Sequence, residues 1–222
     1  MKASVIVPTL NEEDAIGKVL AEVQVIDLID EVIVVDSSTD ATAKIAESLG
    51  AKVVFESRKG YGRALQTGVE NASGDVVIYM DGDHTYDARD ILRIVEPISG
   101  GKYDVVLGNR LCNKMQSGAM SLFNRFGNTL ISLVFSLFFF RKVDDTQCGL
   151  RAIRSRFLEG LSYRNYGMPY VTEQLIRLVK KGVRIANTPI TYRPRIGTTK
   201  LCTWTDGFRI LRVIFRERFL EW

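Results

Sequence analysis

The chain has 222 residues, of which 46% are hydrophobic and 25% charged, and a formal net charge of +4 at pH 7, as expected for one large globular domain with a full core. Its single histidine, His84, excludes a histidine-based triad and a multi-histidine metal site, and three cysteines without paired spacing argue against disulfides or zinc and for a reducing compartment. We expect no signal peptide, because Met1 leads directly into a predicted strand.

Short apolar runs and amphipathic segments alternate along the first half of the chain. Strands are predicted over 3–7, 31–35, 52–55, 76–80 and 103–107, and helices in the intervals between them. The first helix is expected to have Asn11 as its N-cap and acidic residues in its first turn. The second half adds helices over 118–140, 154–161 and 171–181, a strand over 183–188 and a terminal helix. This order predicts an α/β fold, with a mostly parallel sheet flanked by helices, in a single domain over 1–222.

Two carboxylates, Asp81 and Asp83, follow the apolar run 76–80 directly. Such a run is typical of a buried strand, and open α/β sheets bind ligands at the carboxyl ends of their strands. Pro8-Thr9 and Asp36 end two other predicted strands, so we expect all these polar tips to converge on one edge. Paired carboxylates suit Mg²⁺ or Mn²⁺ bridging to substrate phosphates, although an isolated Asp-x-Asp is more often an acidic turn.

Gly60 and Gly62 lie in a loop after the third predicted strand. A dinucleotide-binding loop would have its third glycine at Leu65 and would follow the first strand, so this signal for a nicotinamide cofactor is weak. Together with Arg58 and Lys59, the glycines would allow backbone N–H groups and cations to approach a diphosphate. A plain glycine turn at the start of a helix explains them equally well.

Seven short motifs occur along the chain in this order: VIVPTLNE at 5–12, VDSSTD at 35–40, KGYGRA at 59–64, DGD at 81–83, GNR at 108–110, DTQCGLR at 145–151 and GTTKL at 197–201. In their order and spacing they resemble the family 2 glycosyltransferases of the GT-A (Rossmann-like) fold, and within them the polyprenyl- (dolichyl-) phosphate sugar synthases. The resemblance implies transfer of a sugar from a nucleotide-diphosphate donor to a membrane-embedded polyprenyl phosphate. It implies no nucleic-acid partner.

The resemblance also implies roles at matching positions. The expected donor-binding residues are Pro8, Thr9, Asn11, Glu12, Asp36, Lys59, Gly60, Asp81, Asp83 and Lys200. The two aspartates among them are the expected metal ligands. The residues expected near the acceptor phosphate are Arg110, Arg125, Gln147 and Arg151, with Glu173 as a further family glutamate at the substrate site.

The chain departs from the family pattern at three positions. Mannosyl members usually have glutamine where this chain has Thr85, and an aromatic residue is common where it has Leu10. The family arginine three residues before the terminal-loop glycine is replaced by Pro194, so Arg193 or Arg195 must substitute for it. These departures weaken the case for GDP-mannose and leave UDP-glucose and UDP-N-acetylglucosamine open as donors.

The expected chemistry needs no general base. A phosphomonoester, with a second pKa of about 6, is mostly dianionic near neutral pH and can attack the anomeric carbon unaided. A single attack inverts that carbon. The expected catalytic groups are therefore those that position and neutralise anions, namely Asp83, Arg110, Arg125 and Arg151. His84 is expected to be a structural neighbour of the site.

Two helices, over 118–142 and 203–222, are expected to lie at a membrane interface. In the first, Ser121, Arg125, Asn128, Ser132 and Ser136 form a polar stripe that we expect to face the active site. Its apolar stretch over 130–140 is too short to span a bilayer, so we expect no transmembrane helix. The lipid-facing residues are expected to be Phe135, Phe138, Phe139 and Phe140. The second helix carries a row of arginines and ends at Trp222, a possible interface anchor.

The predicted enzyme is thus peripheral, on the cytoplasmic face of a membrane, as a possible homo-oligomer or with a small membrane-anchoring partner. One alternative is a sugar-1-phosphate nucleotidyltransferase, which would require a glycine-rich basic loop where residues 8–11 read Pro-Thr-Leu-Asn. Another is a catalytically idle subunit recruited to the membrane. Intact Asp81, Asp83 and Arg110 argue against it.

Overall fold

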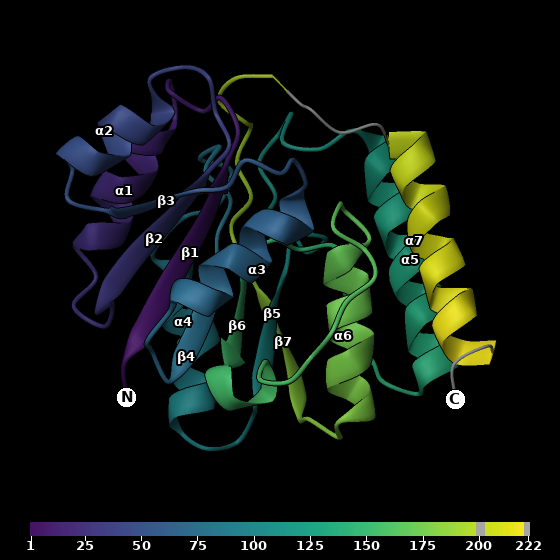
Figure 1. Ribbon diagram of the computed structural model, residues 1–222. Helices are drawn as coiled ribbons and strands as arrows, with labels where there is room; N and C mark the ends of the chain where they lie inside the picture. Colours follow the sequence, from purple (N-terminus) through teal and green to yellow (C-terminus); the bar gives the residue numbers. More distant parts are fainter. Residues whose placement is uncertain (199–202, 220–222) are drawn as a thin grey trace.

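One mixed sheet organises the molecule (Figure 1). The computed structural model describes residues 1–198 and 203–219, and within them seven strands lie in the order β3-β2-β1-β4-β6-β5-β7. The strands are β1 (Ala3–Thr9), β2 (Glu31–Asp36), β3 (Lys52–Phe55), β4 (Val76–Tyr79), β5 (Val105–Asn109), β6 (Arg151–Arg154) and β7 (Ile185–Pro189). The helices are α1 (Ile16–Gln24), α2 (Thr42–Ser48), α3 (Tyr61–Asn71), α4 (Asp90–Ser99), α5 (Leu122–Phe139), α6 (Tyr170–Lys180) and α7 (Thr203–Phe219).

The predicted mostly parallel sheet is confirmed, with one reversed strand that the sequence pattern does not indicate. β6 runs antiparallel between β4 and β5, and Ile153 pairs with both Val77 and Val105. A helix was predicted over 154–161, but only a 3₁₀ turn at Ser155–Phe157 is found there. β6 has only four residues, with arginine at both ends, and its apolar pattern is too short to indicate a strand from the sequence.

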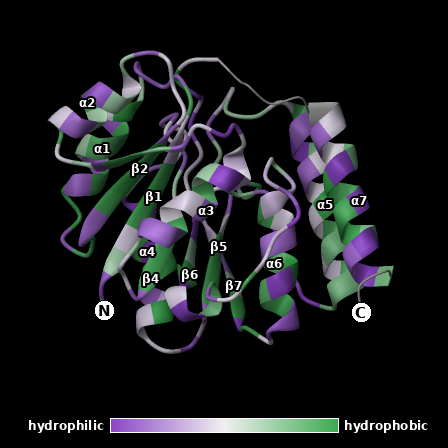
Figure 2. Cartoon of the chain, viewed as in Figure 1, coloured by the Kyte–Doolittle hydropathy of each residue, from purple (hydrophilic) through white to green (hydrophobic). Residues whose placement is uncertain are grey.

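Helices cover both faces of the sheet. On one face of the sheet, the core is formed by the strands with α1, α2 and α4. On the other face, the core is formed by the strands with α3 and α6, and α5 and α7 add further buried side chains to it. Figure 1 shows α5 and α7 side by side at one end of the molecule. The central strands β1, β2 and β4 are largely hydrophobic (Figure 2), as expected where both faces are covered.

The predicted start of the first helix is wrong. α1 begins at Ile16, after Ala15 at the N-cap position, and not after Asn11. Asn11 has a positive φ of 51°, and its side-chain Oδ1 accepts a hydrogen bond from Thr39 N at 2.9 Å. Because the Asn11 amide is engaged by the neighbouring loop, it cannot cap the helix.

Two serines of the predicted polar stripe of α5 contact the segment next to the site, whereas Arg125 of the stripe is exposed, and two of the phenylalanines predicted to face lipid lie in the core. Ser132 and Ser136 hydrogen-bond to the segment 143–146, which leads into Gln147 at the site. Phe135 and Phe139, however, are 0% and 6% exposed in the core. The large apolar side chains that α5 exposes are Leu122, Phe123, Phe126, Leu130, Leu133 and Leu137, followed by Phe140 at its C-cap.

Candidate active site

A cavity of about 370 Å³ opens at the edge of the sheet where β1, β2 and β4 end. This is the edge predicted for ligand binding. The predicted site residues that line it are Pro8, Thr9, Glu12, Lys59, Gly60, Asp81, Asp83, Arg110, Gln147 and Arg195. The lining residues that the sequence analysis did not assign to the site include Ser37, Tyr61, Gly149, Met168, Tyr192 and Asp206.

Asp81 lines this cavity, two residues after the end of β4. Its Oδ1 accepts a hydrogen bond from the hydroxyl of Tyr61 at 2.7 Å. A Cβ on Gly149 would lie 2.5 Å from the other oxygen, so only glycine allows the carboxylate this position. Burial raises the pKa of the Asp81 carboxyl to about 6, and the nearby charge of Asp83 adds to that rise.

Asp83 is 3% exposed and holds fixed partners on both carboxylate oxygens. Oδ1 accepts hydrogen bonds from Thr85 N at 3.1 Å and from Thr85 Oγ1 at 2.6 Å. Oδ2 forms an ion pair with Arg195. The two carboxylates therefore differ: Asp81 is held by a neutral hydroxyl, and Asp83 by a cation.

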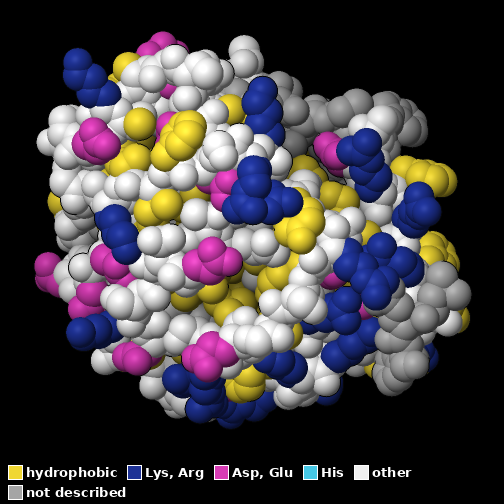
Figure 3. All heavy atoms as spheres, in the orientation of Figure 1, with side chains coloured by type: hydrophobic (Ala, Val, Ile, Leu, Met, Phe, Trp, Pro, Cys, Tyr) yellow, Lys and Arg dark blue, Asp and Glu magenta, His cyan; other side chains and the backbone are white. Residues whose placement is uncertain are grey.

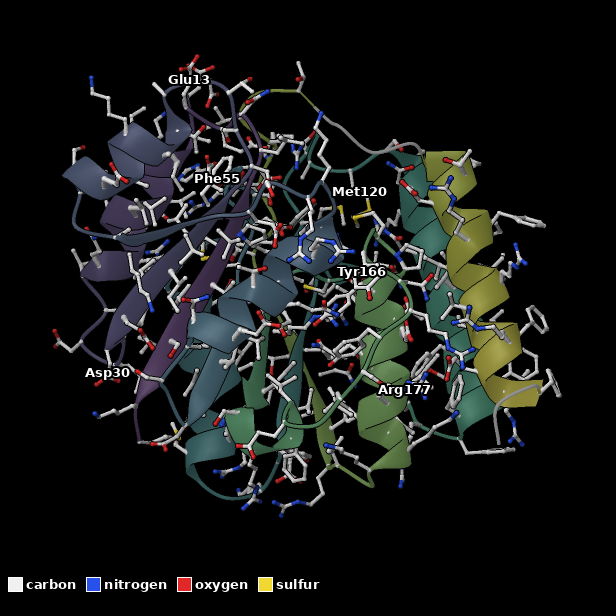
Figure 4. The ribbon with its side chains drawn as sticks, in the orientation of Figure 1. Glu13, Asp30, Phe55, Met120, Tyr166 and Arg177 are labelled. Atoms are coloured by element: carbon white, nitrogen blue, oxygen red, sulfur yellow. The ribbon has the colours of Figure 1, made fainter. Side chains whose placement is uncertain are left out.

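The glycines at the start of α3 serve close packing. Gly60 has a φ of 144°, and a Cβ there would lie 2.4 Å from the carbonyl oxygen of Tyr166. A Cβ on Gly62 would lie 2.2 Å from Tyr170 Cβ. The Arg63 guanidinium lies 3.8 Å from the Tyr166 ring centroid, and Figure 4 shows Tyr166 next to α3. These contacts fix the wall of the cavity that Lys59 and Gly60 line.

Arg110 and Asp145 form a buried, two-pronged ion pair. Arg110 Nε lies 2.7 Å from Oδ2, and Nη2 lies 2.9 Å from Oδ1. Asp145 is 0% exposed and Arg110 is 7% exposed. The guanidinium also lies 5.3 Å from the ring centroid of Tyr192. Arg110 thus lines the cavity with a guanidinium whose orientation is fixed by Asp145.

The structure corrects the predicted role of Arg151. Its side chain is buried, and it donates hydrogen bonds to the carbonyl oxygens of Thr146, Cys148 and Val171. With these acceptors around it, the guanidinium cannot reach a phosphate in the cavity. It holds the segment 146–148 against the start of α6.

Glu173, predicted at the substrate site, is buried beside it and outside the cavity lining. It is 0% exposed, and it accepts hydrogen bonds from Arg164 N at 3.0 Å and from Asn165 N at 2.9 Å. Arg177 lies 3.5 Å from it, and Figure 4 shows Arg177 between α6 and α7. Glu173 therefore fixes the loop that continues through Tyr166 to the cavity wall.

Two predicted donor-binding residues lie beside the cavity without lining it. Asp36 is 1% exposed, and its Oδ1 accepts hydrogen bonds from Thr9 Oγ1 at 2.6 Å and from Ser38 Oγ at 2.5 Å. Asn11 is exposed and bonded to Thr39. Both tie β1 to the loop after β2, and neither takes the predicted direct position in the cavity.

Arg193 and Arg195 lie differently relative to the cavity. Arg193 lies 2.9 Å from both Glu22 and Asp87, outside the cavity lining, whereas Arg195 lines the cavity. The exposed Arg125 also lies outside the lining, with Nη2 3.3 Å from the Leu111 carbonyl oxygen. Lys200 lies outside the described residues.

The carboxylates at this site suit a divalent cation that takes some of its ligands from the protein and the others from a substrate. Within residues 1–198 and 203–219, no group of three or more His, Cys, Asp or Glu side chains is placed to hold a metal ion. Asp81 and Asp83 supply hard oxygen ligands, and their repulsion, seen in the raised pKa of Asp81, would be relieved by a cation. Mg²⁺ is commonly bound by one or two carboxylates together with substrate phosphates. The residues present therefore fit Mg²⁺ or Mn²⁺.

The sequence matches known glycosyltransferases. The model of glycosyl transferase family 2 matches residues 4–162. A dolichyl-phosphate hexose transferase of Haloferax volcanii is 36% identical over 221 residues, covering 97% of this chain and 95% of that protein. A low-salt glycan biosynthesis hexosyltransferase of the same organism is 34% identical over 214 residues, 94% of this chain. The chain spans only 52% of the length of this second relative.

Solved structures share the fold. Glucosyl-3-phosphoglycerate synthase from Mycobacterium tuberculosis, in complex with Mn²⁺, uridine diphosphate and glucosyl-3-phosphoglycerate, has a TM-score of 0.76 at 24% identity, covering 98% of this chain and 80% of that one. Mannosyl-3-phosphoglycerate synthase from Rubrobacter xylanophilus has a TM-score of 0.78 at 20% identity, with 98% and 74% covered. The predicted GT-A fold is confirmed. The chain belongs to glycosyl transferase family 2 and is a glycosyltransferase.

Proposed function

We propose that the enzyme transfers a hexose from a nucleotide-diphosphate sugar to a polyprenyl (dolichyl) phosphate. The observation that carries this proposal is a single cavity in which Asp81 and Asp83 lie with Arg110 and Arg195. Such a site suits two phosphate-bearing substrates, one bound through a metal and the other by cations. The dolichyl-phosphate hexose transferase of Haloferax volcanii, similar along nearly its whole length, supports this acceptor.

Asp81 and Asp83 would hold Mg²⁺ or Mn²⁺, which would neutralise the charge that develops on the leaving diphosphate. Pro8, Thr9 and Glu12, from the end of β1, line the donor side of the same cavity. The Mn²⁺ and uridine diphosphate of the glucosyl-3-phosphoglycerate synthase complex support this use of the fold.

The acceptor phosphate would attack without a general base, because it is already largely dianionic above its second pKa of about 6. His84 does not line the cavity, and its Nε2 lies 3.0 Å from Glu22 Oε1. The buried Glu173 is committed to backbone N–H groups. Both positions support direct attack and inversion at the anomeric carbon.

The surface of α5 and α7 supports a peripheral position at a membrane. α5 alone among the described helices is long and apolar enough to span one, with a mean hydropathy of 1.3 and 22% of it buried. Its serines and inward phenylalanines attach it to the protein, which favours a helix lying in the interface. α7 exposes Phe208, Phe215 and Phe219. Figure 3 shows lysine and arginine side chains gathered over α6 and α7.

A donor and acceptor screen tests the proposal. The protein is incubated with phytanyl phosphate in anionic vesicles and with GDP-mannose, UDP-glucose or UDP-N-acetylglucosamine, and lipid-linked sugar is measured by mass spectrometry. Parallel reactions contain 3-phosphoglycerate, because the solved neighbours make sugar derivatives of that acceptor. We expect a lipid-linked product with one donor. Transfer to 3-phosphoglycerate alone would overturn the proposed acceptor.

A further inference from the structure

We propose that Arg195 is an exchangeable internal cation: it balances Asp83 in the free enzyme and passes to the donor diphosphate when metal and nucleotide bind. The proposal deepens the proposed function and rests on its metal site. Metal binding by the free enzyme would then be opposed by Arg195, and the nucleotide would remove that opposition.

The backbone keeps Arg195 within reach of Asp83. Arg193 N donates a hydrogen bond of 2.8 Å to the Thr85 carbonyl oxygen, and Ile196 N donates one of 3.1 Å to the Asp83 carbonyl oxygen. These two bonds flank Arg195 and attach its segment to the residues that follow β4. The guanidinium can therefore change partner by side-chain rotation alone, without displacement of the segment.

Arg195 pairs with the carboxylate oxygen of Asp83 that Thr85 leaves available. Oδ1 already accepts two hydrogen bonds from Thr85, and Oδ2 is paired with Arg195 Nη2. A divalent cation and the guanidinium are both positive, so they compete for Oδ2 and repel each other when close. Metal binding in the absence of nucleotide must break this ion pair.

A nucleotide diphosphate offers Arg195 an alternative anionic partner. The Arg195 side chain is 26% exposed and lines the cavity, so it can be reached by a ligand, and arginine binds phosphate oxygens in paired hydrogen bonds. Its Nη1 is 3.1 Å from the Thr198 carbonyl oxygen, a neutral contact that is less costly to give up than an ion pair. Metal and nucleotide would thus favour each other's binding through one shared side chain.

Direct titration with Mn²⁺, followed by electron paramagnetic resonance, tests this exchange without any measurement of turnover. Without nucleotide, we expect Arg195→Met to bind Mn²⁺ at least about tenfold more tightly than the wild type, corresponding to about 1.4 kcal/mol. We expect the same variant to bind the Mn²⁺ complex of uridine or guanosine diphosphate at least about tenfold more weakly. Arg195→Lys keeps the charge, so its Mn²⁺ affinity should stay near that of the wild type.

Arg89→Met is the matched control. Arg89 forms a similar ion pair with Asp87, at 2.6 Å, but its side chain is 83% exposed and lies outside the cavity lining. The Mn²⁺ affinity of Arg89→Met should equal that of the wild type.

Unchanged or weaker Mn²⁺ binding by Arg195→Met, in a protein whose thermal melt shows that it is folded, would overturn the exchange and leave the proposed function standing. Mn²⁺ binding that is the same in Asp83→Asn and in the wild type, with and without nucleotide, would overturn the metal site and the exchange together.

Discussion

The hydroxyl of Tyr61 lies 2.7 Å from Asp81 Oδ1 and connects the start of α3 to the end of β4 across the cavity. This hydrogen bond favours the ionised carboxylate, yet burial and the charge of Asp83 still raise the pKa of Asp81 to about 6. The free enzyme therefore keeps a carboxylate at a position where its ionisation is unfavourable.

Asp81→Asn should abolish activity and stabilise the free enzyme. Because the pKa of Asp81 is raised on folding, the folded protein binds this proton more tightly than the unfolded chain, and stability falls as pH rises from about 4 to about 6. Above that window the ionised carboxylate costs about 3 kcal/mol of folding free energy, which the amide avoids. Thermal melts should show a higher Tm for the variant at pH 8 and little difference at pH 4. A lower Tm at pH 8 would contradict this reading of Asp81.

Asp83→Asn should lower kcat by about a hundredfold or more, an effect expected when developing charge loses a stabilising group. The amide retains an oxygen for the hydrogen bonds from Thr85, so circular dichroism should show an intact fold. In the wild type, activity should disappear with chelator and return with Mn²⁺. Full activity of either protein in excess chelator would refute the metal requirement.

Arg110→Met should destabilise the protein by about 3–5 kcal/mol, because it leaves the fully buried Asp145 without its partner. Lysine cannot make both hydrogen bonds to Asp145, so the stability of Arg110→Lys should lie between those of the wild type and Arg110→Met, and its activity should be reduced. Urea denaturation of Arg110→Met, Asp145→Asn and the double variant measures the coupling. Additive effects of the two changes would show that the pair contributes little.

Leu133→Ser with Leu137→Ser should weaken binding to anionic vesicles and leave Tm nearly unchanged, because both side chains are about two-thirds exposed on α5. Phe135→Ser with Phe139→Ser should do the reverse, because these side chains are in the core and each contributes about 1.5–3 kcal/mol of burial. Vesicle co-sedimentation and thermal melts separate the two surfaces. Equal sedimentation of the leucine variant and the wild type would remove α5 from the membrane interface.

Glu173→Gln should raise the KM for the donor more than it lowers kcat, because the loop at 164–168 loses an ionic acceptor while the reacting groups stay in place. The pH dependence of kcat should keep its shape. A loss of kcat of a thousandfold or more with unchanged KM would instead identify Glu173 as a general base.

The sequence predicted the strands and the polar groups at their ends because both signals are local. A buried strand appears in the sequence as a short apolar run, and the first charged residue after the run marks its end, as Asp81 does after residues 76–80. The convergence of these tips follows from the rule that parallel strands share one carboxyl edge. The four-residue β6 fell below the length at which such a pattern is visible.

The partners of buried charges could not be predicted in this way. Arg110 pairs with Asp145 35 residues away, and Glu173 takes backbone donors that no side-chain pattern reveals. On α5, leucine and phenylalanine occur on both the inner and the outer face, so the polar stripe could not say which phenylalanines lie inward. Phe135 and Phe139 were placed on the wrong side for this reason.

The reversed direction of β6 brings two distant segments of the chain together at the cavity. Because β6 runs against β4, the segment 144–150 enters the sheet at the edge where Asp81 leaves it, and Gly149 meets that carboxylate. Residues from Pro8 to Asp83 supply part of the cavity lining, and this later segment adds Gln147 and Gly149 to it. A hybrid enzyme that takes 144–150 from a relative with another acceptor would change this part of the lining, provided that Asp145, which pairs with Arg110, and the glycine next to Asp81 are both kept.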